Sequence, residues 1–421
     1  MYKLKTLSSG LRVLLVPSRH TEVFTLLVLV GTGSKYETKR LNGISHFLEH
    51  MFFKGTKHRP SPGDVARTLD GLGAQHNAFT TQEVTGYWVK AAREHFDVSL
   101  DVVSDILTGP LLSSEEIEKE RGVILQELRM RNDDPISRAG ILFEELLWGD
   151  QPAGWWIIGS EKTIKGLGRD DFLQYFRTHY VVANTLVIVS GAYPANALHK
   201  INKAFLKLRR GSISKKRHTK DQQRVPALRV KQKGVEASNI ILGFRAFSMH
   251  DPRRFALNML GVILGGNSSA RLPMKIREEL GLAYYIRASA SLYTDTGYFE
   301  ISAGVPHHAV SRVVETIIDE LRRIKEHGVT AAELRKAKDY IRGNTQIELE
   351  DSSALASFFG EQVLFEKKVL TPKALLQRME AIRASDVWRV AKMILTPART
   401  NLVVVGDNQK GSALTRILEK I

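Results

Sequence analysis

The chain divides near its middle into two halves that carry similar patterns of apolar and turn residues. Leu186–Gly191 near the end of the first half resembles Leu402–Gly406 near the end of the second. Near the starts, Leu26–Gly31 parallels Ile240–Gly243, and a helical pattern follows each run. Equivalent segments lie about 210 to 216 residues apart. Two matches in the same order at a near-constant offset favour an internal duplication of one unit that contains both helices and strands.

A polar, strongly basic segment separates the two halves. Between Lys200 and Lys233 there are thirteen lysines or arginines and one acid, which give +12 of the chain's formal charge of +16. The stretch holds a single aromatic residue, Phe205, and therefore offers few stacking surfaces for nucleic acid bases. We interpret it as a solvated linker and expect no nucleic acid partner, with an arm that binds a polyanion or an acidic partner as the alternative.

Length and composition set the remaining limits. For 421 residues two domains of about 200 residues are expected, and we predict them at 1–208 and 227–421, joined by the linker 209–226. The chain has no cysteine, so disulfides, thiolate nucleophiles and cysteine-ligated metals are excluded. The start of the chain lacks a signal-peptide pattern, and its longest early apolar run, Val23–Val30, is far shorter than the ~20 residues that span a bilayer. We expect a cytoplasmic protein with no membrane segment.

The strongest chemical signal is the pentapeptide His46-Phe-Leu-Glu49-His50. On a helix, side chains four residues apart stand on one face, so both imidazoles can reach one zinc ion. Glu49 then stands beside the metal and can reach a water molecule there. This order is the reverse of the commoner His-Glu-x-x-His motif. The alternative interpretation is a helix whose two histidines simply lie at the surface, but the flanking residues are mostly apolar.

A catalytic zinc also needs a third protein ligand, and a carboxylate is expected. The signal Ser113-x-x-Glu116 predicts a helix that runs to about Arg131. Glu120 and Glu127 lie two turns apart on one face of it, so helical phase leaves open which is the ligand and which orients a ligating imidazole. Such a centre would acidify a water molecule, with Glu49 as the general base of hydrolysis.

At this point the sequence resembles the pitrilysin or insulysin superfamily of metallopeptidases. It is most similar to the bacterial half-length class related to mitochondrial processing peptidase. The similarity covers nearly the whole chain, and Phe53–Thr56 matches the segment after the zinc motif. It implies one zinc ion per chain held by His46, His50 and Glu127, with Glu120 as the supporting glutamate.

Two further segments carry the resemblance. Asn77, Ala78 and Phe79, followed by threonine, match an edge strand that pairs with the substrate backbone in the family, and Glu83 occupies its usual acidic place. From the residues alone, ordinary strand packing also explains Ala78 and Phe79. In the second half, Gly265–Leu272 and Ile276–Tyr284 match the family's second active-site element. The resemblance implies that Arg277 holds the substrate backbone and that Tyr284 donates a hydrogen bond to the developing oxyanion.

We therefore expect an α+β fold with two homologous domains, each a mainly antiparallel sheet packed with helices, and a zinc endopeptidase that hydrolyses unfolded peptides. Because one chain carries both active-site elements, a homodimer of complete subunits enclosing a chamber is expected. The alternatives are a catalytically silent core or assembly subunit of the same family, and a peptide- or polyanion-binding protein that uses the basic stretch.

Overall fold

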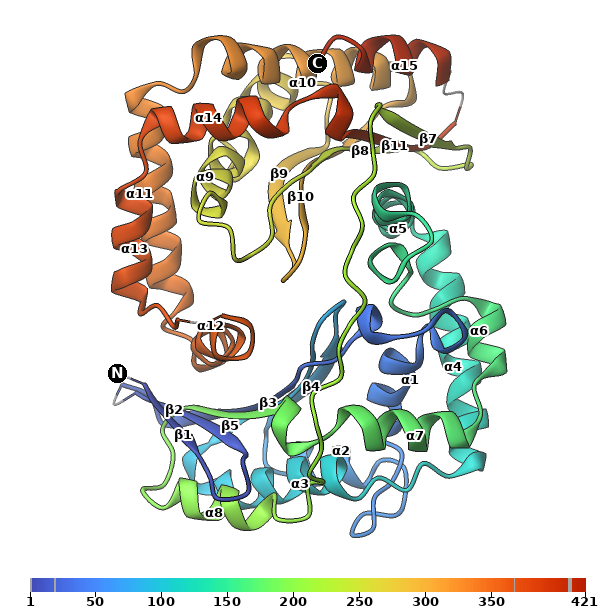
Figure 1. The fold of residues 1–421 in the computed structure, drawn as a ribbon, viewed down its shortest axis with the longest axis vertical. Helices are drawn as coiled ribbons and strands as arrows, with labels where there is room; N and C mark the ends of the chain where they lie inside the picture. Colours follow the sequence, from blue (N-terminus) through green and yellow to red (C-terminus); the bar gives the residue numbers. More distant parts are fainter. Residues whose placement is uncertain (1, 19, 367, 408–410) are drawn as a thin grey trace. The chain divides into compact units, whose positions relative to one another are not determined.

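The computed structural model describes residues 2–18, 20–366, 368–407 and 411–421. The chain forms two compact units, and each combines one sheet with helices (Figure 1). Unit 1 consists of Met1–Arg129, Trp155–Arg217 and Gln346–Val369. Unit 2 consists of Met130–Gly154, His218–Thr345 and Leu370–Ile421.

The sheet of unit 1 has six strands in the order β1-β2-β6-β3-β5-β4. Its strands are β1 Lys3–Thr6, β2 Arg12–Pro17, β3 Val23–Val30, β4 Gln75–Thr80, β5 Thr85–Ala92 and β6 Thr185–Gly191. Neighbours run antiparallel except for the parallel pair β2–β6. The outer strand β4 pairs with β5 alone, so its other edge has no partner strand within the described chain.

The sheet of unit 2 repeats this arrangement in the order β7-β11-β8-β10-β9. Its strands are β7 Ala227–Lys231, β8 Ser238–Arg245, β9 Tyr285–Leu292, β10 Gly297–Val305 and β11 Thr400–Val405. One parallel pair, β7–β11, is again followed by antiparallel neighbours. The prediction of two similar α+β domains with mainly antiparallel sheets is confirmed, and residues 210–226 between them form no helix or strand.

Central strands are apolar on both faces, so each sheet must be covered on both sides. In β3, Phe24 and Leu26 face the main core of unit 1, whereas Leu27 and Leu29 face the other side. The main core is built with helices that include α1 (Ile44–Met51), α3 (Phe96–Thr108) and α7 (Arg169–His179). Helix α12 (Ser352–Phe365) covers the second face, as Figure 1 shows, and the burial of Phe359 stabilises this contact by about 1.5–3 kcal/mol.

The covering helices make both units discontinuous in sequence. Helix α12, Ser352–Phe365, comes from the second half of the chain but packs on β3 and β6 of unit 1. Helix α5, Pro135–Trp148, comes from the first half but packs on β11 and β8 of unit 2. The two consecutive domains predicted from the sequence did not include this exchange, because apolar periodicity identifies a buried helix face without identifying the sheet that buries it.

The remaining helices complete the units. Those of unit 1 are α1 Ile44–Met51, α2 Asp64–Asp70, α3 Phe96–Thr108, α6 Glu161–Gly166, α7 Arg169–His179 and α8 Ala197–Ala204, and α4 Ser114–Asp133 begins there. Those of unit 2 are α9 Arg254–Gly265, α10 Val310–His327, α11 Ala331–Glu348, α13 Pro372–Glu380, α14 Ala384–Ile394 and α15 Gly411–Leu418. None of the described helices combines the length and the apolar character needed to cross a lipid bilayer.

Candidate metal centre

The helix that carries the pentapeptide is short, and the carboxylate of a nearby residue outside the helix anchors its start. Helix α1 follows Gly43, whose positive φ of 98° suits glycine and which offers no side chain as a cap. The buried Glu37 supplies the missing acceptors: its Oε2 accepts from the Gly43 N–H at 2.8 Å and its Oε1 from the Ser45 N–H at 2.9 Å. These bonds fix the start of the turn that carries His46.

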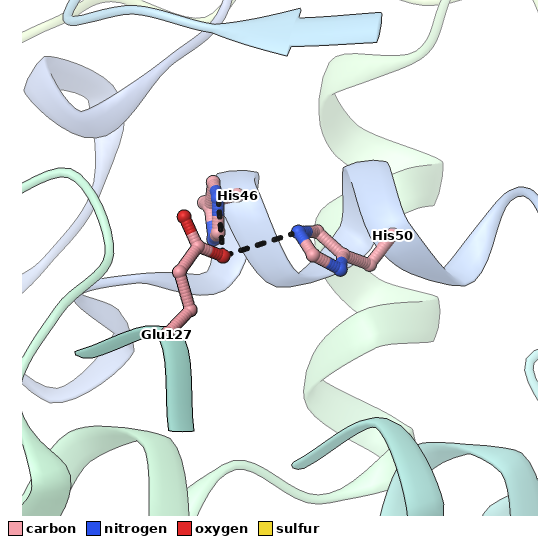
Figure 2. Close-up of side chains that lie close together, drawn as sticks. All are labelled: His46, His50 and Glu127. Carbon is pink, nitrogen blue, oxygen red and sulfur yellow. Dashed lines mark ion pairs between the residues drawn. The ribbon is translucent and has the colours of Figure 1, made fainter. Parts of the chain in front are cut away.

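His46, His50 and Glu127 converge on one point (Figure 2). The Glu127 Oε2 atom lies 3.7 Å from the Nε2 atom of His46 and 3.7 Å from that of His50. Ligands held at 2.0–2.2 Å around a tetrahedral zinc ion would lie about 3.3–3.6 Å from one another. The three side chains are therefore spaced to surround a metal ion of this size.

The structure separates the two glutamates that helical phase left equivalent. Glu120 lies beside His50 and accepts from its Nδ1 atom at 2.9 Å, while its second oxygen pairs with Lys54 at 2.7 Å. Burial by itself would raise the pKa of Glu120, but the hydrogen bonds from His50 and Lys54 outweigh it and lower that pKa below its usual range. A charged acceptor at Nδ1 keeps the proton there and leaves Nε2 free to bind metal.

Glu49 points toward the end of strand β4. The Thr80 hydroxyl donates to Glu49 Oε2 at 2.5 Å. Burial raises the pKa of Glu49 above its usual value, more than the Thr80 bond lowers it. A raised pKa is the direction that a general base working near neutral pH requires.

Strand β4 carries the predicted substrate-binding residues at the open edge of the sheet. Asn77 is exposed, and its side-chain oxygen accepts from the Ala78 N–H at 2.8 Å. Ala78 packs against the core that contains α1, whereas Phe79 faces α12 and lies over Gly86 of β5. Phe79 thus serves packing, and the backbone of β4 remains the feature suited to pairing with a peptide.

The basic linker reaches the turn between β4 and β5. Glu83 in this turn is 5% exposed and pairs with Lys35 at 2.9 Å and with Lys216 of the linker. The side chain of Lys35 is fully buried, so Glu83 is its counter-ion. Burial would raise the pKa of Glu83, but the two ammonium groups lower it below its usual range. Lys216 is therefore fixed beside the hairpin that carries Thr80.

Arg277 and Tyr284 lie in unit 2. Arg277 belongs to a π-helical segment, Pro273–Glu279, and its guanidinium lies 3.3 Å from Glu278. Tyr284 immediately precedes β9, is 68% exposed, and donates its backbone N–H to the Gly304 carbonyl. Their roles toward a substrate stay predictions.

Several residues around the centre had no role in the sequence-based prediction. Lys54 and Thr80 lie inside matched motifs, and their partners become visible only in three dimensions. Glu37 gives no sequence signal at all, because a glutamate that caps a helix beginning seven residues later has no recognisable spacing.

Comparisons with known proteins match both halves of the chain. Residues 12–147 match the model described as insulinase (peptidase family M16), and residues 166–341 match the peptidase M16 inactive domain. An uncharacterized zinc protease of Streptomyces coelicolor is 33% identical over 95% of this chain and 88% of its own length. One from Bacillus subtilis is 31% identical over 94% of this chain and 96% of its own length.

Solved structures agree. The crystal structure of a protease from Helicobacter pylori superposes with a TM-score of 0.90 at 25% identity, over 96% of this chain and 99% of that one. A peptidase M16 inactive domain from Pseudomonas fluorescens gives a TM-score of 0.89 at 16% identity, over 97% and 98% of the two chains, and shares the fold. This chain belongs to the insulinase family of peptidases, family M16.

Proposed function

We propose that this chain is a zinc-dependent endopeptidase that cleaves unfolded peptides, with Glu49 as the general base. The observation that carries the proposal is the convergence of His46, His50 and Glu127, with the Glu49 carboxylate held beside them by Thr80. The relatives named zinc proteases support the family and the metal.

The donor set fits zinc. Two imidazole nitrogens and one carboxylate oxygen form a known catalytic zinc set that leaves a fourth position open. The spacing of the three groups suits one zinc ion per chain. When bound, zinc would supply a Lewis acid that polarises a carbonyl and acidifies water.

Glu49 would move the proton. It takes a proton from the attacking water as the water oxygen bonds to the scissile carbonyl carbon. It then gives that proton to the amide nitrogen as the carbon–nitrogen bond breaks. Glu120, through His50, keeps one imidazole in the orientation that binding requires.

The substrate would lie along β4 as an added strand, because that edge offers unpaired backbone groups. In the same proposal Tyr284 donates a hydrogen bond to the oxygen on which negative charge develops, and Arg277 holds the substrate backbone. Homodimer formation around a chamber and a cytoplasmic location stay predictions.

The test is hydrolysis of a quenched fluorescent peptide by wild type, by Glu49→Gln and by the exposed control Glu22→Gln, with zinc measured in each. We expect wild type and control to carry one zinc per chain and to cleave. Glu49→Gln should keep zinc and lose activity by about 100-fold or more, the scale of a positioned general base. Equal cleavage by wild type and Glu49→Gln would refute the role of Glu49.

Two other outcomes separate the alternatives. Zinc binding without cleavage of varied peptides would favour a silent core subunit, although all four proposed chemical groups are retained. Salt-dependent polyanion binding abolished by neutralising Lys215, Lys216 and Arg217 would favour the binding-protein alternative. The ion pair between Lys216 and Glu83 argues against a freely available arm.

A further inference from the structure

Unit 2 contains a cavity that the proposed chemistry does not use. It has a volume of about 510 Å³ and lies between α5 and the face formed by β8, β9 and β10. Its walls include the aromatic rings of Phe143, Tyr285 and Tyr298. Small-ligand sites have volumes of about 300–1,000 Å³ and mostly apolar walls with a few polar groups, so this cavity has the size and character of a binding site.

Two carboxylates line the cavity, and they differ in their hydrogen-bond partners. Glu144 of α5 accepts hydrogen bonds from the hydroxyls of Tyr293 at 2.8 Å and Tyr298 at 3.2 Å. None of the described residues donates a hydrogen bond to Glu300 of β10 or forms an ion pair with it. Burial, and then the nearby Glu144, raise the pKa of Glu300 to about 7. A partly buried carboxylate without a partner is costly, and a cation entering the cavity would remove that cost.

The charges of the cavity favour a single positive charge in a ligand. Arg287 of β9 is the one cationic side chain among the described lining residues, so with both carboxylates ionised the net charge is −1. In the strand register Arg287 lies opposite Ser302, whereas Glu300 lies opposite Ser289. Arg287 and Glu300 are therefore diagonal neighbours, two residue pairs apart along the ladder. Aromatic walls stabilise a cation further through their ring faces.

The edge of the sheet indicates what kind of molecule brings the cation. Strand β9 is the outermost described strand of its sheet and pairs with β10 alone. An extended peptide can add to such an edge through backbone hydrogen bonds, and its alternate side chains then enter pockets on one face of the sheet. Tyr285 and Arg287 of β9 line this cavity, so a side chain of an added strand would be delivered to its rim.

We propose that this cavity is a specificity site for a basic side chain, arginine or lysine, of an extended peptide bound along β9. Glu300 accepts the cationic group, Glu144 adds a second negative charge, and the rings of Phe143 and Tyr298 pack against the aliphatic stem. The site lies within unit 2, and its binding does not depend on the zinc centre.

The experiment measures equilibrium binding of two labelled peptides by fluorescence anisotropy. The peptides are identical except that one has a central arginine and the other the uncharged isostere citrulline. The protein is the full chain carrying Glu49→Gln, so that hydrolysis does not interfere. Glu300→Gln is added in one variant, and Glu236→Gln, an exposed acid of the same unit, serves as the matched control.

We expect the parent and the Glu236→Gln control to bind the arginine peptide at least about tenfold more tightly than the citrulline peptide. Glu300→Gln should reduce this preference to about twofold or less while binding of the citrulline peptide is unchanged. Equal affinities for the two peptides in the parent, or a preference that survives in Glu300→Gln, would overturn the proposal. Neither outcome bears on the zinc centre, which is tested separately by hydrolysis.

Discussion

Replacing Glu120 with glutamine should weaken zinc binding by about 10- to 100-fold. Glu120 is 4% exposed and acts on the proposed metal site through His50. The Nδ1 atom of His50 lies 2.9 Å from the carboxylate of Glu120. The second oxygen pairs with Lys54 at 2.7 Å. Glutamine keeps the shape of this side chain but carries one acceptor and one donor. Its NH2 group must therefore face either the Nδ1–H of His50 or the ammonium of Lys54, and both are donors.

The size of the effect follows from these contacts. A hydrogen bond to a charged group is worth about 1.5–3 kcal/mol, and each 1.4 kcal/mol is a tenfold change in affinity. Loss of partners that orient metal ligands in other proteins costs a similar 10–100-fold. The substitution leaves the three proposed ligands in place. It weakens metal binding because His50 loses the charged acceptor of its Nδ1–H group.

The assay is competition for zinc against a chromogenic chelator, with thermal unfolding measured on the zinc-free protein. Glu115→Gln, an exposed position in the first turn of the same helix, is the matched control. Zinc affinity of Glu120→Gln within threefold of wild type would refute the role assigned to Glu120. A large loss of stability in the zinc-free variant would instead show that Glu120 serves folding.

Three further predictions concern other parts of the chain. Thr80→Val should lower kcat for peptide hydrolysis by about tenfold without changing the zinc content, because it removes the hydrogen bond that holds Glu49; unchanged kcat would contradict this. Lys216→Met should speed amide hydrogen exchange at residues 81–84, whereas the exposed control Lys215→Met should not; equal exchange in both would contradict the linker contact. Glu300→Gln should stabilise the protein more at pH 8 than at pH 5, judged by thermal unfolding. The reason is that Glu300 has a pKa of about 7 in the folded protein, against an ordinary value of 4.5. Its carboxyl group therefore lowers the stability of the folded protein as the pH rises through this range, by at most about 3 kcal/mol. A larger stabilisation by Glu300→Gln at pH 5 than at pH 8 would contradict this.

Much of the centre could be predicted because its chemistry is local in sequence. The spacing of His46 and His50 fixes a common helix face, and α1 confirms the helix. The Ser113 signal predicted α4, and Ser113 indeed caps its first turn by accepting from the Glu116 N–H at 3.3 Å. Glu127 could not be distinguished from Glu120 by phase, since the difference lies in contacts with His50 from a helix seventy residues away.

The rest depends on long-range packing that local patterns do not encode. The apolar residues of α5 and α12 indicate burial, but each helix covers the sheet of the unit formed mainly by the other half of the chain. Lysine usually lies at the surface, yet Lys35 is buried, because Glu83 from another segment of the chain forms an ion pair with it. The basic linker gave no signal for the specific contact of Lys216.

The most direct test of the zinc centre is the zinc content of the purified chain and of Glu127→Gln by elemental analysis, with peptide hydrolysis followed in the same samples. The assignment of His46, His50 and Glu127 predicts one zinc per wild-type chain. It also predicts zinc affinity lowered by at least about tenfold in the variant, and activity that falls with zinc occupancy and returns with excess zinc. A variant that retains full zinc affinity, or a wild-type chain that binds no zinc, would contradict it.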